Sequence, residues 1–259
     1  MIRNQQPAAV FAALCTAALC FVGLTDIARA DTALIAVATN FVPVATALAP
    51  GFTAATGFEI TITGGSTGKL YAQIAEAAPF EVFLSADTAT PARLITEGLG
   101  VDGSSFTYAT GALVMWSADP ARIGPDGATA LSDAALRFVA IANPDLAPYG
   151  MAAREALTAL DLWDSLGPKI VMGQNVGAAF ALTSSGAAEL GFVALSAVVD
   201  PSIGGSSWIV PQDLYAPIHQ DAVLLTQGAD NPAAVAFLDY LQSDAARAII
   251  AASGYTVSP

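Results

Sequence analysis

Residues 58–74, FEITITGGSTGKLYAQI, place a strand, a polar turn and a helix in direct succession. The opening FEITI has the composition of a strand, GGSTG supplies turn residues, and KLYAQI starts an amphipathic helix. Such a turn occurs in the G-x-S-x-G elbow of serine hydrolases, in nucleotide-binding phosphate loops, and at hydroxyl-rich helix starts that hold an anion. Which of these three it forms decides the function of the protein.

The same succession recurs along the chain. An apolar run at 33–40 is followed by helical spacing at 41–52, and a strand at 82–85 is followed by a helix that ends at Gly98. Strands that alternate with helices at this spacing predict a parallel α/β sheet. The pattern restarts after 106–120, at 137–160, 169–186 and 188–198, before extended structure at 207–226 and two terminal helices.

Two α/β units, with a last segment that returns to the first unit, predict a two-lobed clamshell that holds a ligand in its cleft. We expect residues 31–108 and 209–259 to form the first lobe, and residues 109–208 to form the second. One larger sheet is the alternative, because periodicity alone does not separate the two architectures.

The first thirty residues have the layout of a secretory signal peptide. Arg3 precedes an apolar run at 7–24, and Ala28-Arg29-Ala30 offers small residues at both cleavage-site positions. A membrane anchor is the alternative, since the run approaches the length that spans a bilayer. The adjacent cleavage site favours removal after Ala30, so residues 1–30 are predicted to be a signal peptide and the product to be periplasmic.

Composition excludes several kinds of site. Cys15 and Cys20 both fall in the leader, and His219 is the one histidine, which excludes thiolate and histidine zinc sites after cleavage. The formal net charge of −13 makes nucleic acid or anionic lipid a poor partner. A small anion is still compatible with this charge, because neutral N–H and hydroxyl donors at helix starts bind anions.

Four expected helix starts share one design, in which a strand ends in small or polar residues before the helix begins. Each start offers unpaired backbone N–H groups at the positive end of a helix dipole. Ordinary N-capping explains any one of them, and only the set, on loops that point the same way, favours an anion site. The four are Thr39-Asn40, Ser66-Thr67-Gly68, Tyr149-Gly150 and Asn175-Val176-Gly177.

Six segments, in order and over nearly the whole chain after the leader, resemble the periplasmic molybdate-binding proteins of ABC importers. The resemblance implies a type II periplasmic-binding fold and a substrate-binding component, not an enzyme, that holds molybdate or tungstate through neutral donors. It also implies a membrane permease as partner, a monomer, no cofactor and no directly coordinated metal. The segments are AVATNF, GGSTGKLYAQI, FEVFLSAD, NPDLAPYGMAAREAL, GQNVGAAFALTSSGAAELGFVALS and APIHQDAVLL.

Carried over position by position, the resemblance also implies the ligand residues. Tyr149 and Val176 would act through their backbone N–H groups. Some relatives have a ligand tyrosine where this chain has Ala194, which leaves the coordination and the preference between molybdate and tungstate open. The implied oxyanion site consists of Thr39, Asn40, Ser66, Thr67, Tyr149 and Val176.

The enzymatic interpretations of the turn require residues that the chain does not offer in a suitable place. A nucleophilic Ser66 needs a histidine base and a carboxylate, and His219 with Asp221 two residues away is a poor relay. A phosphate loop needs four residues between its glycines and a hydroxyl after its lysine. Here three residues separate Gly64 from Gly68, and Leu70 replaces the hydroxyl.

A receptor for sulfate or phosphate is the alternative within the binding class. Phosphate carries a proton near neutral pH and calls for an acceptor in the site. The four loops place no carboxylate among the assigned residues, and Asp87 is the nearest candidate for that role.

Overall fold

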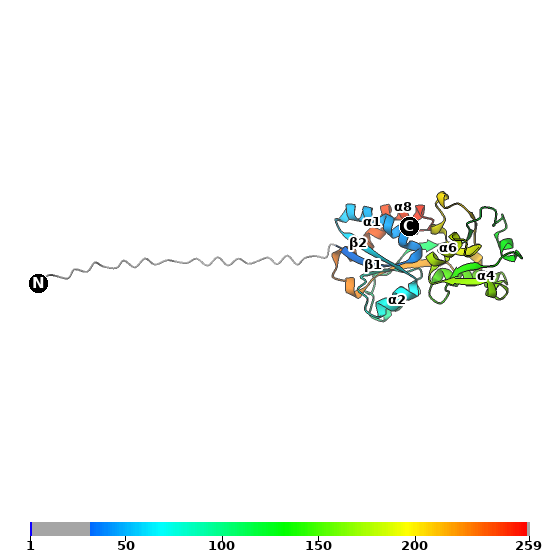
Figure 1. Ribbon diagram of the computed structural model, residues 1–259. Coiled ribbons are helices and arrows are strands. Elements are labelled where there is room, and N and C mark those ends of the chain that lie inside the picture. Colours follow the sequence, from blue (N-terminus) through cyan, green and yellow to red (C-terminus); the bar gives the residue numbers. More distant parts are fainter. Residues whose placement is uncertain (2–31, 258–259) are drawn as a thin grey trace.

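The computed structural model describes Met1 and residues 32–257, so the predicted signal peptide lies outside the described residues apart from Met1. Two α/β lobes lie side by side (Figure 1), each built on one five-stranded sheet. The predicted two-lobed α/β architecture is confirmed, and two sheets replace the single larger one. Within residues 32–257, no helix has the length and apolar character needed to cross a membrane.

The sheet of the first lobe brings two of the predicted loops together. Its strand order is β2-β1-β3-β10-β4, and β10 runs antiparallel to both neighbours. β1 and β2 pair in parallel up to Ala38 opposite Gly65, so Thr39 and Ser66 leave the sheet at the same edge. The strands are β1 (Thr32–Ala38), β2 (Glu59–Gly65), β3 (Val82–Leu84), β4 (Phe106–Gly111) and β10 (Ile218–Leu224).

The sheet of the second lobe does the same for the other two loops. Its order is β7-β6-β8-β5-β9, and β6 pairs with β7 in parallel up to Ala142 opposite Gly173. The loops that lead to Tyr149 and Val176 therefore start from neighbouring strand ends. The strands are β5 (Leu113–Ser117), β6 (Val139–Ala142), β7 (Ile170–Gly173), β8 (Leu190–Ala194) and β9 (Ser206–Ile209).

Helices cover both sheets, and hydroxyl or amide side chains cap several of them. Ser66 Oγ accepts from the N–H of Lys69, and Asn175 Oδ1 accepts from that of Ala178. The helices of the first lobe are α1 (Val42–Thr56), α2 (Thr67–Ala75), α3 (Ala89–Thr96), α7 (Pro232–Leu241) and α8 (Asp244–Ala252). Those of the second are α4 (Pro148–Ala159), α5 (Trp163–Leu166) and α6 (Val176–Ser184). Short 3₁₀ turns include η1 (Thr39–Phe41) and η4 (Leu195–Ala197).

Apolar side chains hold the helices against the sheets. In the first lobe, Phe52 of α1 packs edge-on against Phe237 of α7 on one face, while Leu70 and Leu94 of α2 and α3 are buried on the other. A separate cluster around Phe192 fills the second lobe. Close-packed cores of this kind fix where each helix begins relative to the sheet edge.

The passages between lobes differ slightly from the expected boundaries. The boundaries expected after residues 108 and 208 fall inside β4 and β9, whereas the sheets change after Gly111 and again between Ile209 and Ile218. The first passage takes a single residue between two strands, so no change in composition marks it in the sequence.

Candidate functional site

A small cavity lies where loops of the two lobes meet. The space open to the centre of a water-sized sphere is about 10 Å³, which suits an ion of few atoms and excludes a sugar or a peptide. Its lining includes all six positions expected from the sequence: Thr39, Asn40, Ser66, Thr67, Tyr149 and Val176. The other lining residues are Ala38, Gly65, Ala86, Ala147, Pro148 and Asn175.

The lining of this cavity contains uncharged residues only. Thr67 and Val176 are the first residues of α2 and α6, Tyr149 is the second of α4, and Thr39 opens η1. The N–H groups at these positions have no partner within their own helices, and each helix presents its positive dipole end. The cavity therefore has the donors and the field that an anion requires, without a formal positive charge.

Two hydroxyls at the cavity each accept a hydrogen bond from a backbone N–H. Thr67 Oγ1 accepts from the N–H of Ala86 over 3.1 Å, and Ser66 Oγ accepts from the N–H of Lys69 over 3.3 Å. Each hydroxyl still has its own proton to donate. Thr39 differs, since its hydroxyl donates to the carbonyl oxygen of Gly65 over 2.8 Å, so its backbone N–H is the donor it can offer an anion.

The side chain of Asn40 is hydrogen-bonded away from the cavity. Its amide nitrogen donates to Gln220 Oε1 over 2.8 Å and to the hydroxyl of Tyr255 over 3.0 Å. Both amide protons are thereby used away from the cavity. The part of Asn40 that can serve an anion is its backbone N–H, at the start of η1.

A buried polar network, which the sequence did not predict, lies beside the cavity. Gln220 on β10 joins Asn40 to the hydroxyls of Tyr108 (3.1 Å) and Tyr149 (3.3 Å). The Tyr255 hydroxyl donates to the carbonyl of Asn40 over 2.9 Å. The sequence gives no signal for this network, because the burial of Gln220 beside the exposed His219 is known only from the structure.

The tyrosines of this network remain neutral. Burial raises the pKa of Tyr108 and Tyr149 well above the usual value, and raises that of Tyr255 to about 12 against the hydrogen bonds that lower it. The network therefore adds no charge beside the cavity near neutral pH.

The two lobes touch each other around the cavity. Ser196 of η4 donates its hydroxyl to the carbonyl of Asn40 over 3.1 Å. A Cβ at Gly177, on α6, would lie 2.6 Å from the methyl group of Thr39, so glycine permits the lobes to approach here. The lobes are therefore in direct contact beside the cavity.

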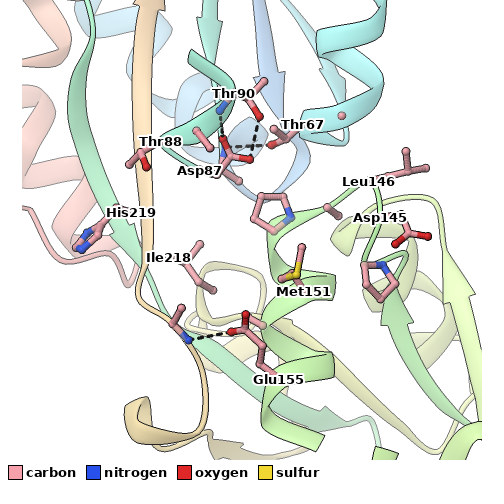
Figure 2. A pocket seen from close by; sticks show the side chains of 18 of the residues that line it. Thr67, Asp87, Thr88, Thr90, Asp145, Leu146, Met151, Glu155, Ile218 and His219 are labelled. Carbon is pink, nitrogen blue, oxygen red and sulfur yellow. Dashed lines mark hydrogen bonds between the residues drawn. The ribbon is translucent and has the colours of Figure 1, made fainter. Parts of the chain in front are cut away.

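A larger groove of about 370 Å³ adjoins the cavity and holds the charged groups that the cavity lacks (Figure 2). Asp87 lines this groove rather than the cavity, and its oxygens accept from the Ser85 hydroxyl and from the N–H and hydroxyl of Thr90. The carboxylate that was the nearest candidate acceptor is thus occupied within its own loop.

Ala194 ends β8 and is buried, with no hydroxyl to offer. It lines a second groove of about 440 Å³, whose lining includes Thr39, Asn40 and Val176. The cavity is therefore assembled without a side-chain donor from this position.

The structure does not assemble a hydrolase triad at Ser66. The Ser66 hydroxyl caps α2, while Nδ1 of His219 pairs with the hydroxyl of Thr110 over 3.0 Å. Asp221 accepts from Thr107 instead of from the histidine. Ser66 thus has neither the base nor the carboxylate that would activate it.

Comparison with known proteins adds three close likenesses and one family. A family model described as bacterial extracellular solute-binding protein matches residues 33–256. The chain is 48% identical over 240 residues to the molybdate-binding protein ModA of Rhodobacter capsulatus, covering 93% of this chain and 94% of that one. It is 47% identical over 230 residues to ModA of Azotobacter vinelandii, covering 88% and 91%. The solved Azotobacter vinelandii periplasmic molybdate-binding protein matches with a TM-score of 0.84 at 41% identity, over 88% of this chain and 100% of that one.

Proposed function

This chain belongs to the bacterial extracellular solute-binding protein family, and on that premise we propose that it binds molybdate as the receptor of an ABC importer. The resemblance to periplasmic molybdate-binding proteins noted in the sequence is confirmed by relatives at 47–48% identity. Tungstate, with the same charge and shape, is expected to bind in the same place.

The observation that carries this proposal is a cavity lined by donors from both lobes and by no charged side chain. A fully ionised tetrahedral dianion needs donors only, and helix starts supply them without a counter-charge. Phosphate near neutral pH carries a proton that would have no carboxylate acceptor here, because Asp87 binds Thr90 and does not line the cavity.

We assign the donors as follows. Thr39, Asn40, Tyr149 and Val176 contribute backbone N–H groups from their helix starts. Thr67 contributes its hydroxyl, which accepts from the Ala86 N–H and keeps its own proton to donate. Ser66 contributes its hydroxyl on the same argument. Support for this assignment comes from the residues that line the cavity and from the hydrogen-bond partners that each of these groups already has.

Sulfate is the closest competitor, since it has the same charge and shape but is smaller. Donors fixed at the distances of longer metal–oxygen bonds would contact sulfate poorly, and unmade hydrogen bonds in a buried site are costly. These donors form a cage around the cavity. Selection between molybdate and sulfate by size therefore depends on the rigidity of this cage, and not on charge.

The remaining parts of the proposal concern the place and manner in which the receptor acts. The receptor acts in the periplasm after removal of residues 1–30, works as a monomer without a cofactor, catalyses no reaction and delivers its anion to a membrane permease. The metal of the anion would be reached through its oxygens and not by a protein ligand.

Isothermal titration calorimetry with molybdate, tungstate, sulfate and phosphate at one ionic strength tests the function. We expect one-to-one binding of molybdate and tungstate, and no heat from the other two. Heat from sulfate or phosphate alone would replace molybdate by that anion. No heat from any of the four anions, together with ester hydrolysis that Ser66→Ala abolishes, would favour the serine hydrolase interpretation.

A further inference from the structure

Gln220 occupies a position that touches both sides of the proposed cage without lining it. Its side chain, on β10, is fully buried. Its amide oxygen accepts from Asn40 Nδ2 over 2.8 Å, and its amide nitrogen donates to the Tyr149 hydroxyl over 3.3 Å. Asn40 belongs to the first lobe and Tyr149 to the second, and both line the cavity.

The two partners present their backbones to the cavity and their side chains to Gln220. Tyr149 is the second residue of α4, and its ring is buried in the core of the second lobe. Fixing its hydroxyl therefore fixes the start of α4 at the cavity. The amide of Asn40 fixes η1 in the same way, because both of its protons are held by Gln220 and Tyr255.

The backbone around Gln220 leaves space for this arrangement. Gly111 ends β4, and a Cβ there would overlap the Tyr149 hydroxyl and lie 2.6 Å from Gln220 Nε2. No larger residue fits at position 111 unless the Tyr149–Gln220 contact moves. The glycine at position 111 is therefore independent support for a specific contact between Tyr149 and Gln220.

We propose that Gln220 is a positioning residue that sets the spacing between the Asn40 and Tyr149 donors, and with it the size selection of the cage. This inference rests on the proposed molybdate site. An amide is the side chain that accepts from Asn40 and donates to Tyr149 at once. Glutamate has the same shape but no donor, and methionine has the same length but neither group.

The test compares purified wild-type protein with Gln220→Met by calorimetry, using molybdate and sulfate as probes. Loss of one buried hydrogen bond corresponds to a roughly tenfold weaker affinity. We expect Gln220→Met to lose at least that for molybdate while binding one anion per folded protein. We also expect the ratio of molybdate to sulfate affinity to fall, since a looser cage no longer selects by size.

Asn231→Leu is the matched control for a purely structural role. Asn231 is also a buried amide, and it donates to the carbonyl of Thr32 and to Glu81, away from the cavity. Its substitution should lower the melting temperature and leave the affinity and selectivity of the folded protein unchanged. A structural effect at Gln220 would give that same result.

The outcomes are distinguishable. A wild-type protein that does not bind molybdate overturns the proposed function. Wild-type binding together with unchanged affinity and selectivity in Gln220→Met overturns the positioning role. If Gln220→Met does not fold, Tyr149→Phe serves instead, because it removes only the hydroxyl at the far end of the contact. It should also weaken molybdate and lower selectivity, and unchanged values there would overturn the inference.

Discussion

The backbone N–H of Gly68 in the first lobe donates to the carbonyl oxygen of Leu146 in the second lobe over 3.0 Å. A Cβ added at position 68 would lie 3.3 Å from both Cα and O of Leu146, so a larger residue would crowd Leu146. Both residues line the groove of about 370 Å³, while their neighbours Thr67 and Ala147 line that groove and the cavity. The Gly68–Leu146 contact thus closes the cleft beside the cavity without supplying a donor to it.

Gly68→Ala should weaken molybdate binding while the protein stays as stable or becomes more so. The added methyl group must displace Leu146 for the cleft to close, and overpacking typically costs about 1 kcal/mol or more, roughly fivefold in affinity. Alanine inside α2 is favoured over glycine by up to about 1 kcal/mol, which acts on stability in the opposite direction. Calorimetry and thermal unfolding measure the two effects separately.

Gly124→Ala is the control, because a Cβ there meets no atom within 4 Å. It should leave the affinity as it is. If Gly68→Ala binds molybdate as tightly as the wild type, the Gly68–Leu146 contact does not limit closure.

Thr67→Ala should weaken the affinity for molybdate by roughly ten- to a hundredfold. A hydrogen bond to a charged group contributes about 1.5–3 kcal/mol, and the substitution also leaves the Ala86 N–H without its acceptor. Thr67→Ser keeps the hydroxyl and should stay within about threefold of the wild type. Calorimetry measures the molybdate affinity of both variants. Equal affinities of Thr67→Ala and Thr67→Ser would show that the Thr67 hydroxyl does not bind the anion.

Much of this arrangement was predictable from the sequence. Strand, turn and helix succeed one another in a regular order, and parallel strands such as β1 and β2 must end at the same sheet edge. The positions of Thr39 and Ser66 at one cavity follow from that rule and from the preference of hydroxyls for helix starts. Local pattern was sufficient because local geometry determines these loops.

The use of individual polar atoms was not predictable. The sequence did not indicate whether Asn40 would use its side chain or its backbone, because Gln220 and Tyr255, which take both of its amide protons, lie 180 and 215 residues away in sequence. Contacts at such separation depend on how the return strand β10 and the C-terminal segment pack. The lobe boundaries were also displaced, since the chain passes from β4 to β5 through a single residue.

Asp87→Asn should leave the discrimination against phosphate intact. If the Asp87 carboxylate accepted the phosphate proton, neutralising it would abolish any phosphate binding. In this structure the carboxylate binds the N–H and hydroxyl of Thr90 at the start of α3, so the expected effect is a loss of about 1 kcal/mol in stability. Urea unfolding measures the stability, and calorimetry with phosphate and molybdate measures the selectivity. A changed ratio of phosphate affinity to molybdate affinity would show that Asp87 does contribute to anion selection.

The buried tyrosines should make the protein lose stability at alkaline pH. Burial raises the pKa of Tyr255 from 10.0 to about 12, so the folded protein keeps a proton that the unfolded chain releases from about pH 10. The stabilisation is complete below pH 10 and is lost as the pH rises toward 12, by about 2–3 kcal/mol in total. Tyr108 and Tyr149, whose pKa values burial also raises, act in the same direction.

Tyr255→Phe should lower stability at pH 8, because the hydrogen bonds of its hydroxyl to Asn40 and Ser196 are lost. It should also reduce the slope of stability against pH above pH 10. Urea unfolding from pH 8 to 11 measures both, with the constant difference between pH 8 and 9 as internal reference. A slope that is the same in both proteins would mean that the Tyr255 hydroxyl ionises as readily in the folded chain as in the unfolded one.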